Sequence, residues 1–428
     1  MTSGAVRSRT AAWARFQPHA AVHALRTLNG RDFRLFYCGY STSLLGSSMA
    51  GVALAFAVLD DGGSASDLGL VLAAVPATQL VFMLFGGVLA DWLGPRRIML
   101  AGDVIRCAAQ TALAAAVLVG RPSLWVFMAL AAVRGLGEAL FNPALGALVV
   151  HVVPSERRGD ANVLLGFSQS VAKVAGPTLA GVLIAVSNAG VVLAADAATY
   201  GCSLVALGLL RLRDVGGRRR PSMLRSLAEG WSEFTSRPWL VASTVQFICV
   251  NFLVWGPFLL LGPVLMHQHP SGARGWGLIM SGYGAGSILG GLVALGRRPS
   301  RPLVVATAAT IGYAAPCALF ALQAPTAVIA AGACLAGVGS TVSAALSDTT
   351  TQQLTPVSVL ARVRTFQTFG AFSLGPLAFA LAGPAATVLG ARPVLGFGAV
   401  AALVSATAVL LLPSVRAVRR PADDREQG

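Results

Sequence analysis

Charged side chains inside apolar segments are the residues best suited to chemistry in this chain. Arg134, Glu138 and Lys173 all lie well inside long apolar runs, where a charge is costly unless it is paired or reaches water. Arg134 and Glu138 are four residues apart and therefore share one face of a helix. A carboxylate whose proton affinity depends on a basic partner and on water access is a usable proton carrier. We predict that these residues serve proton coupling or substrate binding, and the alternative is a static buried ion cluster.

Lys173 stands out because it is the only lysine among the 32 basic residues. It lies in the apolar run that follows the run of Glu138, at a similar distance from the run ends. Helices joined by a short loop run antiparallel, so we expect Glu138 and Lys173 to be close enough to pair.

Three further polar residues, Asp196, Gln246 and Asn251, also lie in apolar runs. Asp196 is near the end of its run, where it either contacts a cationic substrate or caps a helix junction. The two amides either line a cavity or join helices through hydrogen bonds. We predict that all three line a substrate cavity, and the sequence leaves the alternatives open.

The composition places these residues in lipid. The chain has 428 residues, of which 55% are hydrophobic and only 11% charged, whereas soluble domains carry about 25% charged residues. The net charge of +15 arises from short arginine clusters between apolar runs, a pattern typical of membrane proteins and not of nucleic-acid binding. The six cysteines lie within apolar runs without metal-ligand spacing, so we expect no metal site and no cofactor.

Twelve apolar runs are long enough to span a bilayer as helices, which needs about 20 residues. They lack the alternation of a membrane barrel, and an open sheet cannot cross lipid. The sequence therefore predicts an all-α membrane protein with helices near these ranges: 35–59, 67–90, 98–119, 123–150, 161–186, 190–210, 239–265, 275–296, 303–323, 326–349, 364–388 and 393–412.

The arginines predict the orientation of these helices. One set of loops, the N-terminal arm and the C-terminal tail carry most of them, and arginine-rich loops face the cytoplasm. Both termini are therefore expected in the cytoplasm, which requires an even number of spans. The domain organisation that we predict is a basic arm (1–31), a six-helix half (32–210), a cytoplasmic linker (211–238), a second six-helix half (239–413) and a tail (414–428).

The two halves repeat one another. The Gly-x-Gly pair at Gly135 recurs at Gly337, and Gly176-Pro177 recurs at Gly375-Pro376, with nearly the same spacing. Two like-oriented halves indicate a pseudo-twofold axis along the membrane normal, with substrate bound between the halves.

The loop after the second apolar run carries the most specific motif. It contains Gly87, Asp91, Gly94, Arg96 and Arg97 in the segment GVLADWLGPRR. This segment resembles the signature loop of the major facilitator superfamily, and the resemblance implies a latch between the halves that holds the outward-facing state. The alternative is a set of loop arginines that only sets topology.

Other segments are similar to the macrolide-efflux and siderophore-export group of drug:proton antiporters in that superfamily. Asp103 and Arg106 follow the loop and either extend the latch or form a local ion pair. Gly176, Pro177 and Gly181 resemble the helix-five antiporter motif, which implies a hinge; close packing without motion is the alternative.

The function that we expect is secondary transport: proton-coupled export of amphipathic organic molecules, such as antibiotics, siderophores or metabolites, by alternating access. A lipid flippase or a small-solute uptake transporter of the same fold is the alternative, and a non-transporting sensor or a membrane enzyme is a more distant one. The partners that we expect are a small-molecule substrate, protons and membrane lipid, without nucleic acid. We expect a monomer in a bacterial plasma membrane.

Overall fold

Twelve helices long and apolar enough to cross a membrane lie in the described part of the chain. The computed structural model describes residues 27–211, 231–295 and 299–419. Most of the predicted arm, linker and tail lie outside these ranges. The backbone around the signature loop is described, but the surroundings of Gly87 and the side chain of Asp91 are not.

Each helix of the first half is a single uninterrupted element, within a few residues of the predicted range. A capping box at Ser64 starts the second helix: the Ser64 hydroxyl accepts a hydrogen bond from the Asp67 N–H at 3.2 Å, and the Asp67 carboxylate accepts one from the Ser64 N–H at 2.9 Å. The six helices are α3 (Arg31–Asp60), α4 (Ala65–Leu93), α5 (Pro95–Val119), α6 (Leu124–Val152), α7 (Arg158–Val186) and α8 (Ala189–Gly208), and short 3₁₀ turns η1 (Thr27–Asn29) and η2 (Ser155–Arg157) precede α3 and α7.

Three spans of the second half are interrupted, each close to a proline. Pro257, Pro316 and Pro376 cannot donate a backbone hydrogen bond, and each follows a π turn, a 3₁₀ turn or a break in the helix. The spans are α10 (Pro238–Val250) with η3 (Asn251–Trp255) and α11 (Gly256–His267); α12 (Gly272–Ala294); α13 (Pro302–Ala309) with η4 (Thr310–Tyr313) and α14 (Ala314–Ala321); α15 (Thr326–Leu354); α16 (Val357–Ser373) with α17 (Gly375–Leu389); and α18 (Ala391–Leu411), followed by α19 (Pro413–Arg416).

The repeat seen in the sequence has a packing basis. In the first half, a Cβ added to Gly135 would collide with the backbone of α4, and one added to Gly137 would collide with α5. In the second half, Gly337 meets α12 and Gly339 meets α13 in the same way. Because only glycine allows such close approach, the same pair sets the same helix contacts twice, and the two six-helix halves are pseudo-symmetric.

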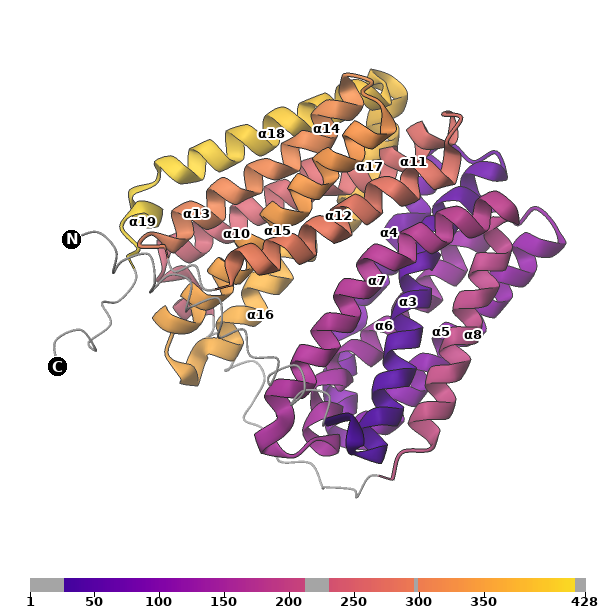
Figure 1. The fold of residues 1–428 in the computed structure, drawn as a ribbon, viewed down its shortest axis with the longest axis horizontal. Coiled ribbons are helices and arrows are strands. Elements are labelled where there is room, and N and C mark those ends of the chain that lie inside the picture. The colour runs from indigo at the N-terminus through magenta and orange to yellow at the C-terminus, as the bar shows by residue number, and fades with distance from the viewer. Residues whose placement is uncertain (1–26, 212–230, 296–298, 420–428) are drawn as a thin grey trace, which may run out of the picture.

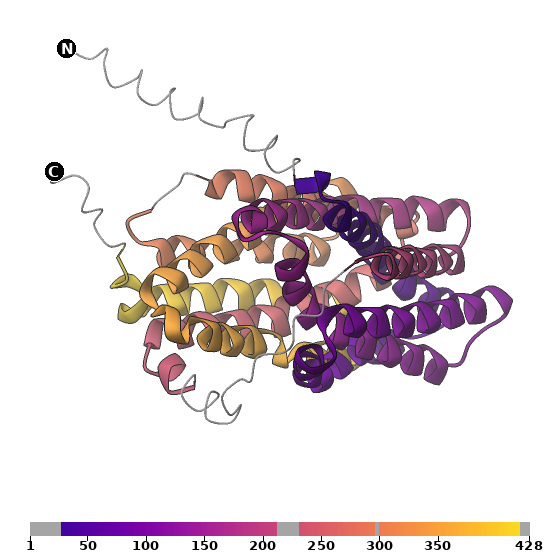
Figure 2. The ribbon, with the colours of Figure 1, turned by 90° about the horizontal axis from the view of Figure 1, so that it is seen from below.

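The two halves contact each other mainly through α7 with α12 and through α4 with α17. We call the end of the bundle where α3 begins and α8 ends the linker end, and the opposite end the far end. Gly181 lies against Ala273, and Gly383 lies against Ser66, all close to the far end. The helices of each half stay together in both views, and the halves diverge toward the linker end (Figure 1, Figure 2).

Thr178 of α7 and Ser281 of α12 have hydroxyl groups in contact across the two halves. A disulfide needs its two Cβ atoms to be close and to face each other. We therefore expect Thr178→Cys with Ser281→Cys to form a cross-link when membranes are oxidised. After cleavage at a protease site inserted in 212–230, the halves should stay joined on a non-reducing gel.

The matched control is Thr178→Cys with Ser287→Cys, because the Ser287 hydroxyl bonds to Tyr283 in its own half. This pair and the parent chain should separate into two fragments. Separation of the Thr178 and Ser281 variant as well would contradict the contact.

Candidate functional site

Arg134 and Glu138 form an ion pair in the middle of α6. The Arg134 Nη2 and Glu138 Oε1 atoms are 3.0 Å apart, and the two side chains are 13% and 19% exposed. This is the geometry expected for residues four apart on one helical face. The pair is therefore partly accessible within a membrane span, which is the requirement for a group that exchanges protons with water.

Lys173 does not join this pair. Its side chain is exposed, and α7 packs mainly on α3 and α12, whereas α6 packs on α4 and α5. The expected pairing of Glu138 with Lys173 is wrong because α6 and α7, although consecutive, barely touch. The Lys173 carbonyl, which Pro177 leaves without its helical donor, lies instead against Gly284 of the other half.

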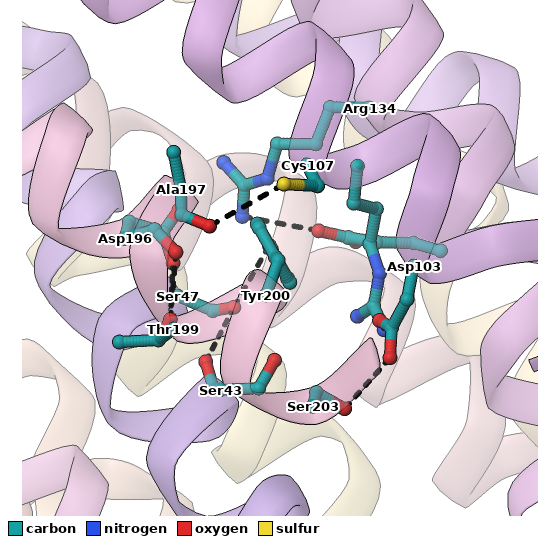
Figure 3. A network of polar contacts seen from close by, with 12 residues as sticks. Ser43, Ser47, Asp103, Cys107, Arg134, Asp196, Ala197, Thr199, Tyr200 and Ser203 are labelled. Atoms are coloured by element: carbon teal, nitrogen blue, oxygen red, sulfur yellow. Dashed lines mark hydrogen bonds and ion pairs between the residues drawn. The ribbon is translucent and has the colours of Figure 1, made fainter. Parts of the chain in front are cut away.

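Asp196 of α8 is fully buried inside the first half, and it is not among the described residues that line the cavity between the halves. Its Oδ1 accepts a long hydrogen bond of 3.4 Å from Thr199, and its Oδ2 has no partner in the described part of the chain. The charged groups that interact electrostatically with Asp196 are Arg134, Glu138 and Arg106. Figure 3 shows Asp196, Tyr200 and the Arg134 guanidinium gathered in one region.

Tyr200 is the central residue of this region and was not singled out from the sequence. It is fully buried, and its hydroxyl lies 2.9 Å from the Ser47 hydroxyl. It also interacts electrostatically with Arg134. A tyrosine in an apolar run looks like an ordinary core residue. Apart from the charged residues nearby, nothing in the sequence therefore marks Tyr200 as part of a site.

Asp103 and Arg106 form a buried ion pair of their own. Ser203 of α8 donates a hydrogen bond of 2.6 Å to Asp103 Oδ2, and the other carboxylate oxygen contacts Arg106. The guanidinium carbon lies 3.9 Å from the centre of the Phe141 ring and 4.7 Å from that of Tyr200. Of the two alternatives, the geometry matches the local ion pair, which joins α5, α6 and α8.

The described part of the signature loop acts within the first half. Gly94 has a φ of 85°, which favours glycine and lets α4 turn directly into α5. Arg96 donates hydrogen bonds of 2.8 Å and 2.6 Å to the carbonyls of Leu207 and Gly208, so it caps the end of α8. Arg97 is exposed, and it also interacts with another group of the protein. The predicted latch role of the loop stays a prediction.

Gly176, Pro177 and Gly181 are packing positions in this structure. Helix α7 runs without interruption through Pro177, Gly176 lies against Ser48 of α3, and Pro177 and Gly181 meet α12. The contacts match the close-packing alternative, and the hinge remains a prediction.

A cavity of about 410 Å³ lies between the halves, lined by α4, η3, α11, α16 and α17. Asn251 lines this cavity, whereas Gln246 is buried and donates a hydrogen bond of 2.8 Å to Thr310; the role of either residue in substrate binding stays a prediction. The wall is mostly apolar and aromatic, and no charged side chain of the described residues lines it. Its aromatic residues are Trp255, Phe369, Phe372 and Phe379.

His267 and Asp60 bridge the halves at the far end. His267 Nε2 lies 3.0 Å from Asp60 Oδ1, and both side chains are partly exposed. The residues are 207 positions apart, and no sequence pattern links them.

Comparison with known proteins agrees with this geometry. The sequence model of the Major Facilitator Superfamily matches residues 36–379. A multidrug efflux pump, Tap, of Mycolicibacterium fortuitum is 26% identical over 82% of this chain and 88% of its own. Macrolide efflux protein A of Streptococcus pyogenes is 25% identical over 61% of this chain and 65% of its own.

Solved structures share the fold. The nucleoside transporter NupG superimposes with a TM-score of 0.71 at 12% identity, over 89% of this chain and 98% of its own. A bacterial homologue of the lysosomal transporter Spinster, in an inward-facing and unoccupied conformation, gives 0.67 at 14% identity, over 95% of this chain and 100% of its own.

The buried pair of Asp103 and Arg106 predicts a large stability effect. Asp103→Asn removes the counter-charge of a buried guanidinium, and breaking such a pair costs about 3–5 kcal/mol. We expect a clear fall in the thermal unfolding midpoint of the purified protein, followed by fluorescence-detected size exclusion.

Asp348→Asn is the matched control because Asp348 is 66% exposed in its 3.4 Å ion pair with Arg364, and exposed pairs contribute about 0–1 kcal/mol. Equal shifts for the two variants would contradict the structural role of Asp103.

Proposed function

The chain belongs to the major facilitator superfamily, and on that premise we propose that it exports amphipathic organic molecules in exchange for protons. The family makes it a multi-pass membrane transport protein with a small-molecule substrate. Export is supported by the relatives, two of which are efflux proteins by name and cover most of the chain or more than half of it.

The proposed orientation of the protein in the membrane follows from its arginines. The linker end carries Arg96, Arg157, Arg158, Arg211 and Arg237, and arginine-rich ends face the cytoplasm. The termini are then cytoplasmic, and the far-end contacts close the outer side while the halves diverge toward the cytoplasm. That arrangement is one of the two states that alternating access requires, and reversal needs the contacts of α7 with α12 and of α4 with α17 to loosen.

The cavity between the halves supports an amphipathic substrate. Its aromatic wall favours apolar surface, and Gln79, Asn251 and Thr368 offer a few uncharged hydrogen-bonding groups. Pockets with this balance bind drug-like molecules through apolar burial. A volume of about 410 Å³ is within the usual range of such pockets, roughly 300–1,000 Å³.

Proton coupling is supported by the ion pair of Arg134 and Glu138. It lies in a membrane span with both side chains partly accessible, and the aligned residues of the second half are Ala336 and Ser340. Packing alone would not require charge in one half only. Glu138 takes up a proton when the cavity faces outward, and the substrate displaces it when the cavity faces inward.

Two related alternatives differ in cargo or direction. A lipid flippase or an uptake transporter of the same fold would use the same halves and the same charged pair. Direction measured with oriented vesicles separates them from an exporter. The latch at Asp91 and the hinge at Gly176 would serve either direction.

Inverted membrane vesicles test the exporter directly. We expect ethidium or erythromycin to accumulate when the lumen is acid, and a protonophore to abolish the accumulation. Glu138→Gln should lower the driven rate at least about tenfold, which corresponds to about 1.4 kcal/mol, because the amide cannot carry a proton.

Glu156→Gln is the control, since Glu156 is an exposed carboxylate at the linker end. Accumulation that resists the protonophore would remove proton coupling. Driven transport that survives Glu138→Gln would make the ion pair a structural one.

Phe372 tests the cavity as the substrate site. Phe372→Ala removes an aromatic wall that is 57% exposed, and we expect KM for ethidium to rise severalfold to about tenfold, since about 1.4 kcal/mol is tenfold. Phe397→Ala on α18 changes a side chain of similar exposure, 62%, that does not line the cavity. An unchanged KM in the first variant would place the substrate elsewhere.

A further inference from the structure

The buried charges of the first half do not balance. Asp103 pairs with Arg106 and Glu138 pairs with Arg134, so each pair is neutral. Asp196 is fully buried as well, and no ion pair holds it in the described part of the chain. A membrane interior strongly disfavours an unpaired ion, so this carboxyl group is the one that must be neutralised in some other way.

The surroundings of Asp196 provide no full set of donors for a carboxylate among the described residues. The side chain is completely buried, one oxygen has only the 3.4 Å contact with Thr199, and the other has no partner. Gly46 of α3 lies directly against Oδ1. An ionised carboxylate accepts several hydrogen bonds when buried, whereas a protonated carboxyl group needs fewer donors around it, has one O–H to donate and carries no charge.

The helices packed around Asp196 bring both charged and uncharged groups toward it. Helix α3 contributes Gly46 and Ser47, which carry no charge. The titratable and charged side chains on the other helices are Arg106 and Cys107 of α5, Arg134 and Glu138 of α6, and Tyr200 of α8.

We propose that Asp196 is a proton-binding site and that Arg134 is shared between Asp196 and Glu138. In the state described by the structure, the proton is on Asp196 and the guanidinium pairs with Glu138. In the alternative state, the proton is on Glu138 and the guanidinium pairs with the Asp196 carboxylate. One proton and one arginine serve two carboxylates, so the net charge is zero in each of these two states.

The exposure of the three side chains gives this exchange a direction. Glu138 is 19% exposed and Arg134 is 13% exposed, whereas Asp196 is fully buried behind them. Glu138 is therefore the more accessible of the two carboxyl groups, and in this proposal protons reach Asp196 through it. Arg134 Nε also has no hydrogen-bond partner among the described residues, so the guanidinium is not fixed by a complete set of bonds. The place of this exchange in a transport cycle rests on the proposed function, but proton binding by Asp196 does not.

Infrared spectroscopy tests the proton without any substrate. The carbonyl stretch of a protonated carboxylic acid is separate from that of a carboxylate. We expect purified parent protein at neutral pH to show this band, and aspartate labelled with ¹³C in the side-chain carboxyl group to shift it. Asp196→Asn should abolish the band, while Asp348→Asn should leave it unchanged.

The outcomes decide the assignment. A band that is absent in the parent, that persists in Asp196→Asn or that shifts only with labelled glutamate would overturn it. If Asp196→Asn does not fold, Asp196→Glu in protein labelled only on aspartate keeps a carboxyl group at this position but should lose the label-dependent shift, which separates Asp196 from the other buried aspartate, Asp103.

Transport assays give a second test, which separates a role of Asp196 in proton coupling from a role in binding the substrate. In proteoliposomes, Asp196→Asn should lose gradient-driven ethidium accumulation but keep counterflow exchange of ethidium, because exchange does not require net proton movement. Driven accumulation at the parent rate would overturn the role of Asp196 in coupling. If the parent itself moves no ethidium, the proposed function fails for this probe, while the infrared result still decides whether Asp196 holds a proton.

Discussion

Lipid supplies neither hydrogen bonds nor counter-ions, and this constraint accounts for most of the arrangement in the first half. Each charge that enters the membrane must be neutralised by the protein itself. Asp103 and Arg106 meet that requirement as a sealed pair, held by Ser203 and by two aromatic rings. Arg134 and Glu138 meet it with partial exposure, so the two pairs differ in how far they are sealed from their surroundings.

The same constraint shapes the backbone. Helices in lipid associate through close packing because no hydrophobic force drives them together. Glycines at equivalent positions of α6 and α15 bring neighbouring helices into contact in both halves. The contact surfaces between the halves also depend on small residues, among them Gly181, Gly277 and Gly284.

The two halves share a framework and differ in chemistry. The first half carries the buried charges, whereas the second half carries the interrupted helices and most of the aromatic cavity wall. Tyr283 and Ser340, whose hydroxyls are 3.0 Å apart, occupy the region where the first half has Glu138. The described structure therefore has its buried charges in one half and most of the aromatic cavity wall in the other.

The sequence by itself determined the twelve helices, the two halves, the family resemblance and the shared helical face of Arg134 and Glu138. These follow from apolar length, from repeated spacing and from the fixed geometry of residues four apart, all of which are local properties. The tertiary structure alone decided which helices touch. It separated Lys173 from Glu138, buried Asp196 beside Arg134 instead of in the cavity, and joined His267 to Asp60. Neighbours in sequence are not neighbours in a helix bundle, because each helix packs where its small residues allow close approach.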